Sequence, residues 1–278
     1  MPPTLTTADG LALHLHHWPC ATPRGTVLLV HGLGEHAGRY AHVAAALNGW
    51  GWNVVAPDHR GHGRSGGGRG CIDRDDALLE DLAVVIDSVR AAQPGRLVLL
   101  GHSMGGLIAS RFVAEALRPQ PAAWSRAVDA LVLSSPALAA DMNAVQTLLL
   151  ATLGRLAPDL AVGNGLKPEW VSRDAAVVKA YVADPLVHDR ISPRLARFIL
   201  EGGELVRSLA PAWRVPTLLM WAGADRCVAP RGSAAFAAAA PKAVVQAQVF
   251  EGTAHEIFNE PEREQVMARL GEWIRQLG

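Results

Sequence analysis

The chain has 278 residues, a length that fits one domain with an insertion or two separate domains. Half of its residues are hydrophobic, so it can bury a sizeable core and is not intrinsically disordered. Its 26 Lys and Arg residues equal its 26 Asp and Glu residues, so no basic excess exists to neutralise phosphates and no nucleic-acid partner is expected.

The first residues, MPPTLTTADG, lack the charged region and the apolar region of a secretory signal. Nowhere do about 18 apolar residues run unbroken, so no transmembrane helix is expected. The three cysteines, Cys20, Cys71 and Cys227, have neither zinc-motif nor disulfide spacing and are interpreted as inert thiols. We therefore expect a soluble protein of the cytoplasm.

Strands and helices are expected to alternate along most of the chain. Residues 4–18 alternate around Asp9-Gly10 and predict an opening β-hairpin. Continuous apolar runs predict strands buried on both faces at residues 26–32, 52–59, 96–103, 130–138, 216–225 and 244–252. Helices are expected at residues 39–49, 74–92, 104–117, 231–240 and 261–277. This alternation predicts an α/β fold with a mostly parallel sheet covered by helices on both faces.

Residues 139–209 break the alternation, because no buried strand occurs there and the pattern is helical. Apolar residues at helical spacing form one stripe, Met142, Val145, Leu149, Leu153 and Leu156. Two interpretations stay open: a helix packed on the main domain, and a lid whose apolar underside contacts an apolar substrate. We interpret residues 1–138 and 210–278 as the core and residues 139–209 as an inserted helical cap.

The strongest functional signal is Gly101-His102-Ser103-Met104-Gly105-Gly106, which spells G-x-S-x-G between a predicted strand and a predicted helix. A serine in such a tight turn is exposed at the carboxyl end of the sheet, next to the N–H groups that begin the helix. Ser103 is therefore the candidate nucleophile. A glycine-rich turn with a purely structural purpose is the alternative.

A serine hydroxyl needs a general base, and the base needs an acid that orients it. His255 follows the last predicted strand, and Asp225 ends the strand before it. Both project from carboxyl ends of strands, where open α/β sheets bind ligands. Asp141 as the acid and His188 as the base are the rival assignments.

The segment from His31 to His36 follows the first buried strand. In hydrolases of this type, the loop at this place supplies one N–H group to the oxyanion hole, and the residue after the nucleophile supplies the other. The main-chain N–H groups of Leu33 and Met104 are thus the expected donors.

The remaining histidines show no metal-site pattern. His14, His16 and His17 are expected on the surface of the hairpin, and no third ligand is evident beside the H-x-H spacing of His14 and His16. No metal ion is therefore expected. Turn geometry and a local polar network explain a further group, which is interpreted as structural: Asp58, Arg60, Gly61 and His62.

Five segments together resemble the monoacylglycerol lipase and lysophospholipase group of α/β-hydrolases: HGLGEHAGRY, PDHRGHGRSGG, GHSMGG, AGADRCV and the His255 loop. The resemblance covers nearly all of the core. It implies an α/β-hydrolase fold with a mostly parallel, eight-stranded sheet, a cap after the sixth core strand, and no cofactor. It also matches Ser103, Asp225 and His255 to the catalytic triad of the family.

By the same resemblance, Glu35 and Arg39 match positions that help to hold the glycerol end of the substrate in monoacylglycerol lipases. An ion pair that ties the loop to the following helix is the alternative interpretation. Phe258 stands where mammalian monoacylglycerol lipases carry a second histidine, and this departure concerns glycerol recognition. We also expect His102 and Leu149 to contact the substrate.

The resemblance implies a serine hydrolase that cleaves a monoacylglycerol to a fatty acid and glycerol through an acyl-enzyme. A lysophospholipase or general carboxylesterase on the same scaffold is the alternative, and a catalytically idle protein that binds an apolar ligand is a remote one. The expected partner is a small lipid ester. The apolar cap helix also suggests transient contact with a membrane surface, and the oligomeric state stays open.

Overall fold

The computed structural model describes residues 2–142 and 144–277. Eight strands form one sheet in the order β1-β2-β4-β3-β5-β6-β9-β10. Their bounds are β1 Thr4–Thr6, β2 Ala12–Trp18, β3 Gly25–Val30, β4 Asn53–Pro57, β5 Arg96–His102, β6 Ala130–Ser134, β9 Thr217–Ala222 and β10 Val245–Phe250. The first two pairings, β1 with β2 and β2 with β4, are antiparallel, and all others are parallel. The predicted eight-stranded, mostly parallel sheet is therefore confirmed.

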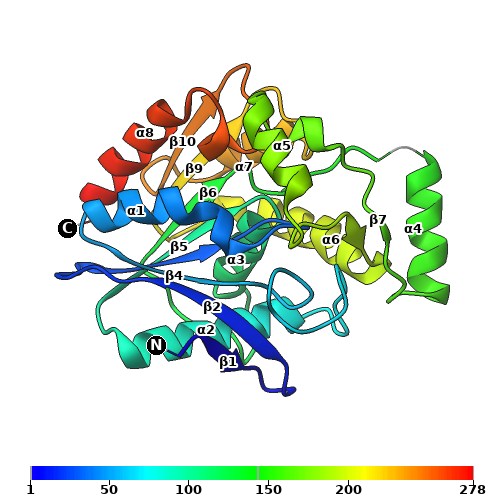
Figure 1. The fold of residues 1–278 in the computed structure, drawn as a ribbon, viewed down its shortest axis with the longest axis horizontal. Coiled ribbons are helices and arrows are strands. Elements are labelled where there is room, and N and C mark those ends of the chain that lie inside the picture. The colour runs from blue at the N-terminus through cyan, green and yellow to red at the C-terminus, as the bar shows by residue number, and fades with distance from the viewer. Residues whose placement is uncertain (1, 143, 278) are drawn as a thin grey trace.

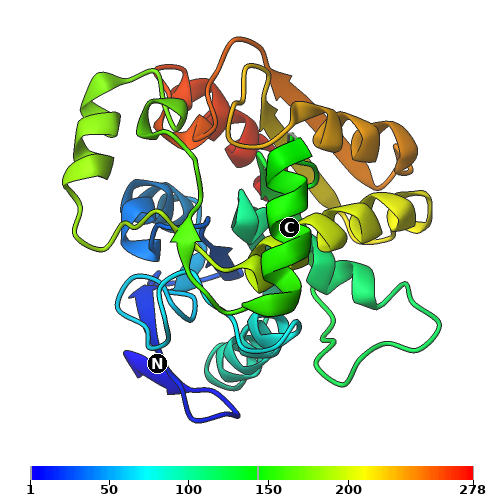
Figure 2. The ribbon, with the colours of Figure 1, turned by 90° about the vertical axis from the view of Figure 1, so that its right-hand side faces the viewer.

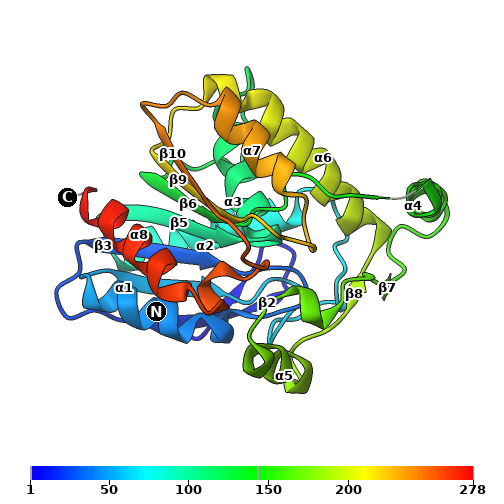
Figure 3. The ribbon, with the colours of Figure 1, turned by 90° about the horizontal axis from the view of Figure 1, so that it is seen from above.

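Helices cover both faces of the sheet (Figures 1 and 3). One face carries α1 (Ala41–Gly49) and α8 (Arg263–Arg275), and the other carries α2 (Ala77–Ala92), α3 (Met104–Glu115), α6 (Pro193–Leu209) and α7 (Pro230–Ala239). Short 3₁₀ turns lie at Ala37–Tyr40, Pro168–Trp170, Ala210–Ala212 and Ile257–Asn259. Neighbouring residues of β3 pack into opposite layers, Val27 with α1 and Leu28 with α2, because side chains alternate across a strand. Burial on both faces explains the continuous apolar runs.

The interval that breaks the alternation contains α4 (Ala144–Leu156), β7 (Val162–Gly163), α5 (Ala175–Ala183), β8 (Arg190–Ile191) and α6. Its last helix packs on α3, where Leu195 and Val206 join the main hydrophobic cluster. The first helix, α4, lies at the edge of the molecule and contacts α6 (Figures 1 and 2). The expected packing of a helix on the main domain is therefore seen for α6. It is not seen for α4, the helix that carries the apolar stripe.

The stripe itself is largely exposed. Leu149 is 53% exposed and Leu156 is 80% exposed, while Met142 and Leu153 are half-buried. The side chain of Val145 lies outside the described part of the chain. Within the described ranges, no helix has both the length and the apolar character that crossing a membrane requires, and the location of the protein stays a prediction.

The segment after β4 is held by local polar contacts, as the sequence predicts. Arg60 donates two hydrogen bonds to the carboxylate of Asp81, each of 2.7 Å. Gly61 has a φ of +70°, and a Cβ there would lie 2.3 Å from the carbonyl oxygen of Gly68. A structural role for this segment therefore has a direct explanation in packing and backbone conformation.

The histidines of β2 do not lie on a free hairpin surface, which corrects the expectation from sequence. β2 is an inner strand between β1 and β4, and His14, His16 and His17 are half-buried. His16 Nε2 lies 3.3 Å from Oδ1 of Asp58, whose carboxylate is fully buried. The short antiparallel strand β1 thus extends the sheet and leaves β2 partly covered.

Candidate active site

The turn between β5 and α3 holds Ser103 in a strained conformation. Its φ is +54° and its ψ is −122°, a region that residues with a side chain rarely adopt. A Cβ at Gly105 would lie 2.0 Å from the carbonyl oxygen of Val30, so only glycine fits there. A purely structural turn would favour glycine at position 103 as well. The strained serine therefore indicates a functional hydroxyl, as the G-x-S-x-G context predicts.

His255 and Asp225 form the next part of the site. His255 Nδ1 lies 2.6 Å from Asp225 Oδ2, and the other carboxylate oxygen accepts the N–H groups of Cys227 and Val228 at 2.8 and 3.0 Å. The two backbone donors hold the carboxylate, and the carboxylate orients the ring. An Nδ1–H that donates to Asp225 leaves Nε2 free to accept a proton.

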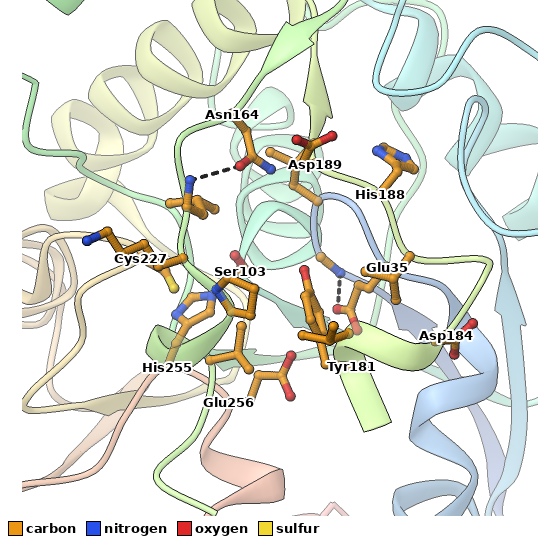
Figure 4. A pocket seen from close by; sticks show the side chains of 18 of the residues that line it. Glu35, Ser103, Asn164, Tyr181, Asp184, His188, Asp189, Cys227, His255 and Glu256 are labelled. Carbon is orange, nitrogen blue, oxygen red and sulfur yellow. Dashed lines mark hydrogen bonds between the residues drawn. The ribbon is translucent and has the colours of Figure 1, made fainter. Parts of the chain in front are cut away.

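Ser103 and His255 line the same pocket, beneath a roof formed by the interval after β6 (Figure 4). The pocket has a volume of about 320 Å³, within the range of small-molecule sites. Its roof comes from residues 164–189, and its apolar part consists of Leu166, Val171, Val182 and Val187. Leu149 does not line it, so its assignment to the substrate site stays a prediction that this arrangement does not support.

The two buried histidines beside Ser103 titrate differently. Burial alone would lower the pKa of His255, but the Asp225 carboxylate outweighs it and raises this pKa above 6.5. Burial and the neighbouring His255 lower the pKa of His102 to about 4. The ring centroids of these two residues are 4.7 Å apart, and His102 Nδ1 lies 3.0 Å from Ser134 Oγ. His102 therefore stays neutral while His255 gains and loses a proton.

The rival triad assignments find no geometric support. Asp141 is exposed on the surface and pairs with Arg231. His188 lines the pocket, but its Nε2 lies 3.1 Å from the carbonyl oxygen of Gly61, and its Nδ1 accepts the N–H of Arg190. Both of its ring nitrogens are thus occupied.

The loop after β3 passes directly beside the nucleophile. A Cβ at Gly32 would lie 3.2 Å from Ser103 Cβ, and the Gly32 N–H donates to Glu35 Oε1 at 2.6 Å. Leu33 lines the pocket, and Met104 begins α3 directly after the serine. Among the described residues, neither of these two N–H groups donates to a loop carbonyl or to a side chain. This placement is compatible with the expected oxyanion hole.

Arg39 joins two buried carboxylates. Its guanidinium donates to Glu35 Oε2 at 2.5 Å and makes two hydrogen bonds to Glu256, of 2.6 and 2.7 Å. It also lies over the ring of Tyr181, 4.8 Å from the ring centre. Burial would raise the pKa of Glu35, but Arg39 outweighs it and the pKa lies below the usual value. The network links the loop after β3 to the loop that carries His255.

This network changes what the sequence suggested for Glu35 and Arg39. The ion pair that was the alternative interpretation is present, and Arg39 does not line the pocket. Sequence reasoning missed Glu256, whose only signal was its place next to His255 on a loop. Phe258 is buried in the core and does not line the pocket, whereas Glu256 does.

The comparisons with known proteins agree with this geometry. A family model described as serine aminopeptidase, S33, matches residues 21–262. The chain belongs to this hydrolase family. It is 38% identical over 261 residues to a monoacylglycerol lipase of Mycolicibacterium smegmatis, which covers 92% of this chain and 90% of that one. It is 31% identical over 252 residues to phospholipase YtpA of Bacillus subtilis, which covers 90% of this chain and 94% of that protein.

A solved structure is similar over the whole fold of this hydrolase. The crystal structure of the monoacylglycerol lipase of Paleococcus ferrophilus matches with a TM-score of 0.82 at 36% identity, covering 95% of this chain and 100% of that one. The α/β-hydrolase fold and the resemblance drawn from the sequence motifs are therefore confirmed.

The raised pKa of His255 predicts a pH dependence of catalysis. The value of kcat/KM should rise with pH as His255 loses its proton, with an acid limb centred above 6.5. Asp225→Asn removes the carboxylate that favours the protonated ring, so the limb should move to lower pH while kcat falls by about 10⁴-fold. Steady-state hydrolysis of a soluble ester from pH 5 to 9 measures both. An unshifted limb in Asp225→Asn would contradict the assignment.

The Arg39 network predicts a large effect on stability. Arg39→Met keeps the length of the side chain but leaves two buried carboxylates without their guanidinium partner, which should lower the free energy of unfolding by about 3–5 kcal/mol. Glu256→Gln is the matched control, because it keeps the pair between Arg39 and Glu35 and should cost less, about 1–3 kcal/mol. Urea unfolding followed by circular dichroism measures both. Equal stability of wild type and Arg39→Met would refute the network.

Proposed function

We propose that this hydrolase cleaves a monoacylglycerol to a fatty acid and glycerol through Ser103, His255 and Asp225. The proposal depends on one observation: the strained Ser103 and His255 line the same pocket. Asp225 orients the ring of His255 through a contact of 2.6 Å between Oδ2 and Nδ1. The relatives named above support hydrolysis of lipid esters, because they are a monoacylglycerol lipase and a phospholipase.

The reaction would proceed in two steps. Ser103 Oγ attacks the ester carbonyl carbon while His255 Nε2 takes the hydroxyl proton, and Asp225 stabilises the imidazolium. The N–H groups of Leu33 and Met104 hold the oxyanion. The intermediate then breaks the bond to the glycerol oxygen, which receives the proton from His255. Water, deprotonated by His255, attacks the acyl carbon, the bond to Ser103 Oγ breaks as this oxygen takes the proton back from His255, and the fatty acid is released.

The charge of the pocket favours an uncharged head group. Four carboxylates line it, those of Glu35, Asp184, Asp189 and Glu256, against the single amine of Lys167. Arg39, which does not line the pocket, pairs with two of these carboxylates, Glu35 and Glu256, and offsets one of the negative charges. A phosphate-bearing lysophospholipid would meet a net negative surface, whereas glycerol hydroxyls can donate to such carboxylates. Glu35 and His102 are the predicted substrate contacts that this pocket retains.

The apolar residues of α4 support one further proposal, transient contact with a lipid surface. Leu148, Leu149 and Leu156 are exposed on this helix, and large exposed apolar side chains favour an interfacial position. Contact through α4 would place the enzyme where lipid esters are concentrated. It requires no membrane-spanning segment.

The nucleophile is tested by one substitution. Ser103→Ala should lower kcat for monooleoylglycerol by more than about 10⁴-fold, because it removes the hydroxyl that forms the acyl-enzyme. It should also abolish labelling by a fluorescent phosphonate, while circular dichroism stays unchanged. Ser208→Ala, at an exposed position on α6, is the matched control and should behave as wild type. Retained turnover in Ser103→Ala would overturn the mechanism.

The substrate class is tested in the same assay with matched panels. Monoacylglycerols of C8 to C18 should be preferred over lysophosphatidylglycerol of equal chain length, because the four pocket carboxylates outnumber the one lysine and repel its phosphate. Preference for the lysophospholipid would favour the phospholipase alternative. Activity confined to short p-nitrophenyl esters would reduce the function to a carboxylesterase, and cleavage of an aminoacyl p-nitroanilide would reveal a peptidase.

The proposed contact of α4 with lipid predicts that removal of its exposed leucines weakens binding of the protein to vesicles. The double variant Leu148→Ser and Leu156→Ser should bind phosphatidylcholine vesicles at least about tenfold more weakly, because each buried leucine contributes about 1.5–3 kcal/mol. Sedimentation with vesicles measures binding. Hydrolysis of a soluble short-chain ester is the control and should not change. Unaltered vesicle binding would exclude α4 as the contact.

A further inference from the structure

A second group of chemically active side chains lies on the sheet, outside the pocket. β2 and β4 pair antiparallel, with His16 opposite Ala56, and the ladder continues because the Asp58 N–H donates to the carbonyl oxygen of His14 at 2.8 Å. Residues opposite each other on antiparallel strands share a face, and so do alternate residues of one strand. The register therefore brings His14, His16 and Asp58 together on one face, and the small Ala56 leaves room between them.

The ligand atoms of these three residues are close to a common point. One ring nitrogen of each histidine and one carboxylate oxygen of Asp58 lie within 4.8 Å of one another. His16 Nε2 and Asp58 Oδ1 are 3.3 Å apart. In a tetrahedral zinc site with bonds of about 2.0–2.2 Å, neighbouring ligand atoms are about 3.3–3.6 Å apart. The His16 and Asp58 ligand atoms therefore already have the spacing of such a site. Rotation of the half-buried His14 side chain would bring its ring nitrogen to the same spacing from both.

The bonding state of these atoms also suits a cation. Among the described residues, the buried His16 Nε2 has no hydrogen-bond partner, which leaves a costly orphan nitrogen beside an anionic oxygen. The Asp58 carboxylate is fully buried and is held by the N–H groups of Ala37 and Arg64, each at 2.9 Å.

The side chains at this place are also of kinds that commonly bind zinc. The Arg64 side chain is a nearby cation that would disfavour a metal ion, and it is exposed to solvent. Two imidazoles with one carboxylate form a donor set that zinc accepts.

We propose that His14, His16 and Asp58 bind one Zn²⁺ ion, with water as the fourth ligand on the side of His14. The ion would join β2 to the segment that follows β4. Because Asp58 also accepts the Ala37 N–H, the same carboxylate would hold the 3₁₀ turn that contains Arg39. This site would be structural, since it lies outside the pocket that contains Ser103.

The test must separate this site from a second group of metal-binding side chains. Asp225, Cys227 and His255 also place one ligand atom each within 4.8 Å of one another, so zinc could bind in the catalytic pocket. The full chain with Cys227→Ser removes the thiol from that group and serves as the parent protein. Isothermal titration with Zn²⁺, after treatment with a chelator, then measures the stoichiometry and Kd at pH 7.5.

The parent protein should bind one Zn²⁺ per chain and show a higher Tm with the ion. His14→Ala and His16→Ala should each weaken binding by at least about 100-fold, more than the loss of an outer partner of a metal ligand. His17→Ala is the matched control, because its ring lies on the opposite face of β2 beside Gln93, and its Kd should equal that of the parent. Co²⁺ in place of Zn²⁺ should give the absorption of a tetrahedral site.

Two outcomes would overturn the proposal. One is the absence of a zinc site in the Cys227→Ser parent, which would assign any binding by wild type to the catalytic pocket. The other is binding that both His14→Ala and His16→Ala retain. If His16→Ala unfolds, His14→Ala alone decides, because its partly exposed side chain is not needed to fill the core.

Discussion

The strained turn at Ser103 is the constraint on which the rest of the site depends. A φ of +54° at a serine costs on the order of 1–3 kcal/mol, and surrounding packing must hold it. Gly105 lies against the backbone of β3, and Gly32 of the following loop lies against Ser103 itself. Because β3 and β5 are adjacent in the sheet, one close contact fixes both the nucleophile and the loop that carries an expected oxyanion donor.

Buried charges make the base and the oxyanion loop interdependent. The pKa of His255 is raised by Asp225 and also by Glu256 and Glu35, which lie farther from the ring. Arg39 binds the last two carboxylates and thereby limits how much negative charge the ring experiences. A buried guanidinium between two carboxylates also needs both partners in place. Arg39, which does not line the pocket, thus influences both the electrostatics of the base and the position of the loop after β3.

The core is well predicted from the sequence because strands buried on both faces appear as continuous apolar runs. The functional turn is also predictable, because it requires glycine at positions beside Ser103. Ser103, Asp225 and His255 follow from chain order and from the carboxyl ends of strands. The pocket roof could not be predicted, because residues 164–189 form short elements without a hydrophobic period, while the periodic stripe of α4 is exposed. Asp58 lies near His16 because of the register between the antiparallel strands β2 and β4. This register cannot be deduced from the spacing of residues within one motif.

The roof and the oxyanion loop are joined by direct contacts. The His188 N–H donates to the carbonyl oxygen of Gly34 at 2.8 Å, and a Cβ at Gly34 would lie 2.3 Å from the carbonyl oxygen of His188. On the same loop, His36 Nε2 lies 2.9 Å from Asp184 of the roof. Gly34 therefore permits an approach that any other residue would prevent. Since Leu33 precedes it, a displacement of the roof would also displace the expected oxyanion donor, which couples access to the pocket with stabilisation of the transition state.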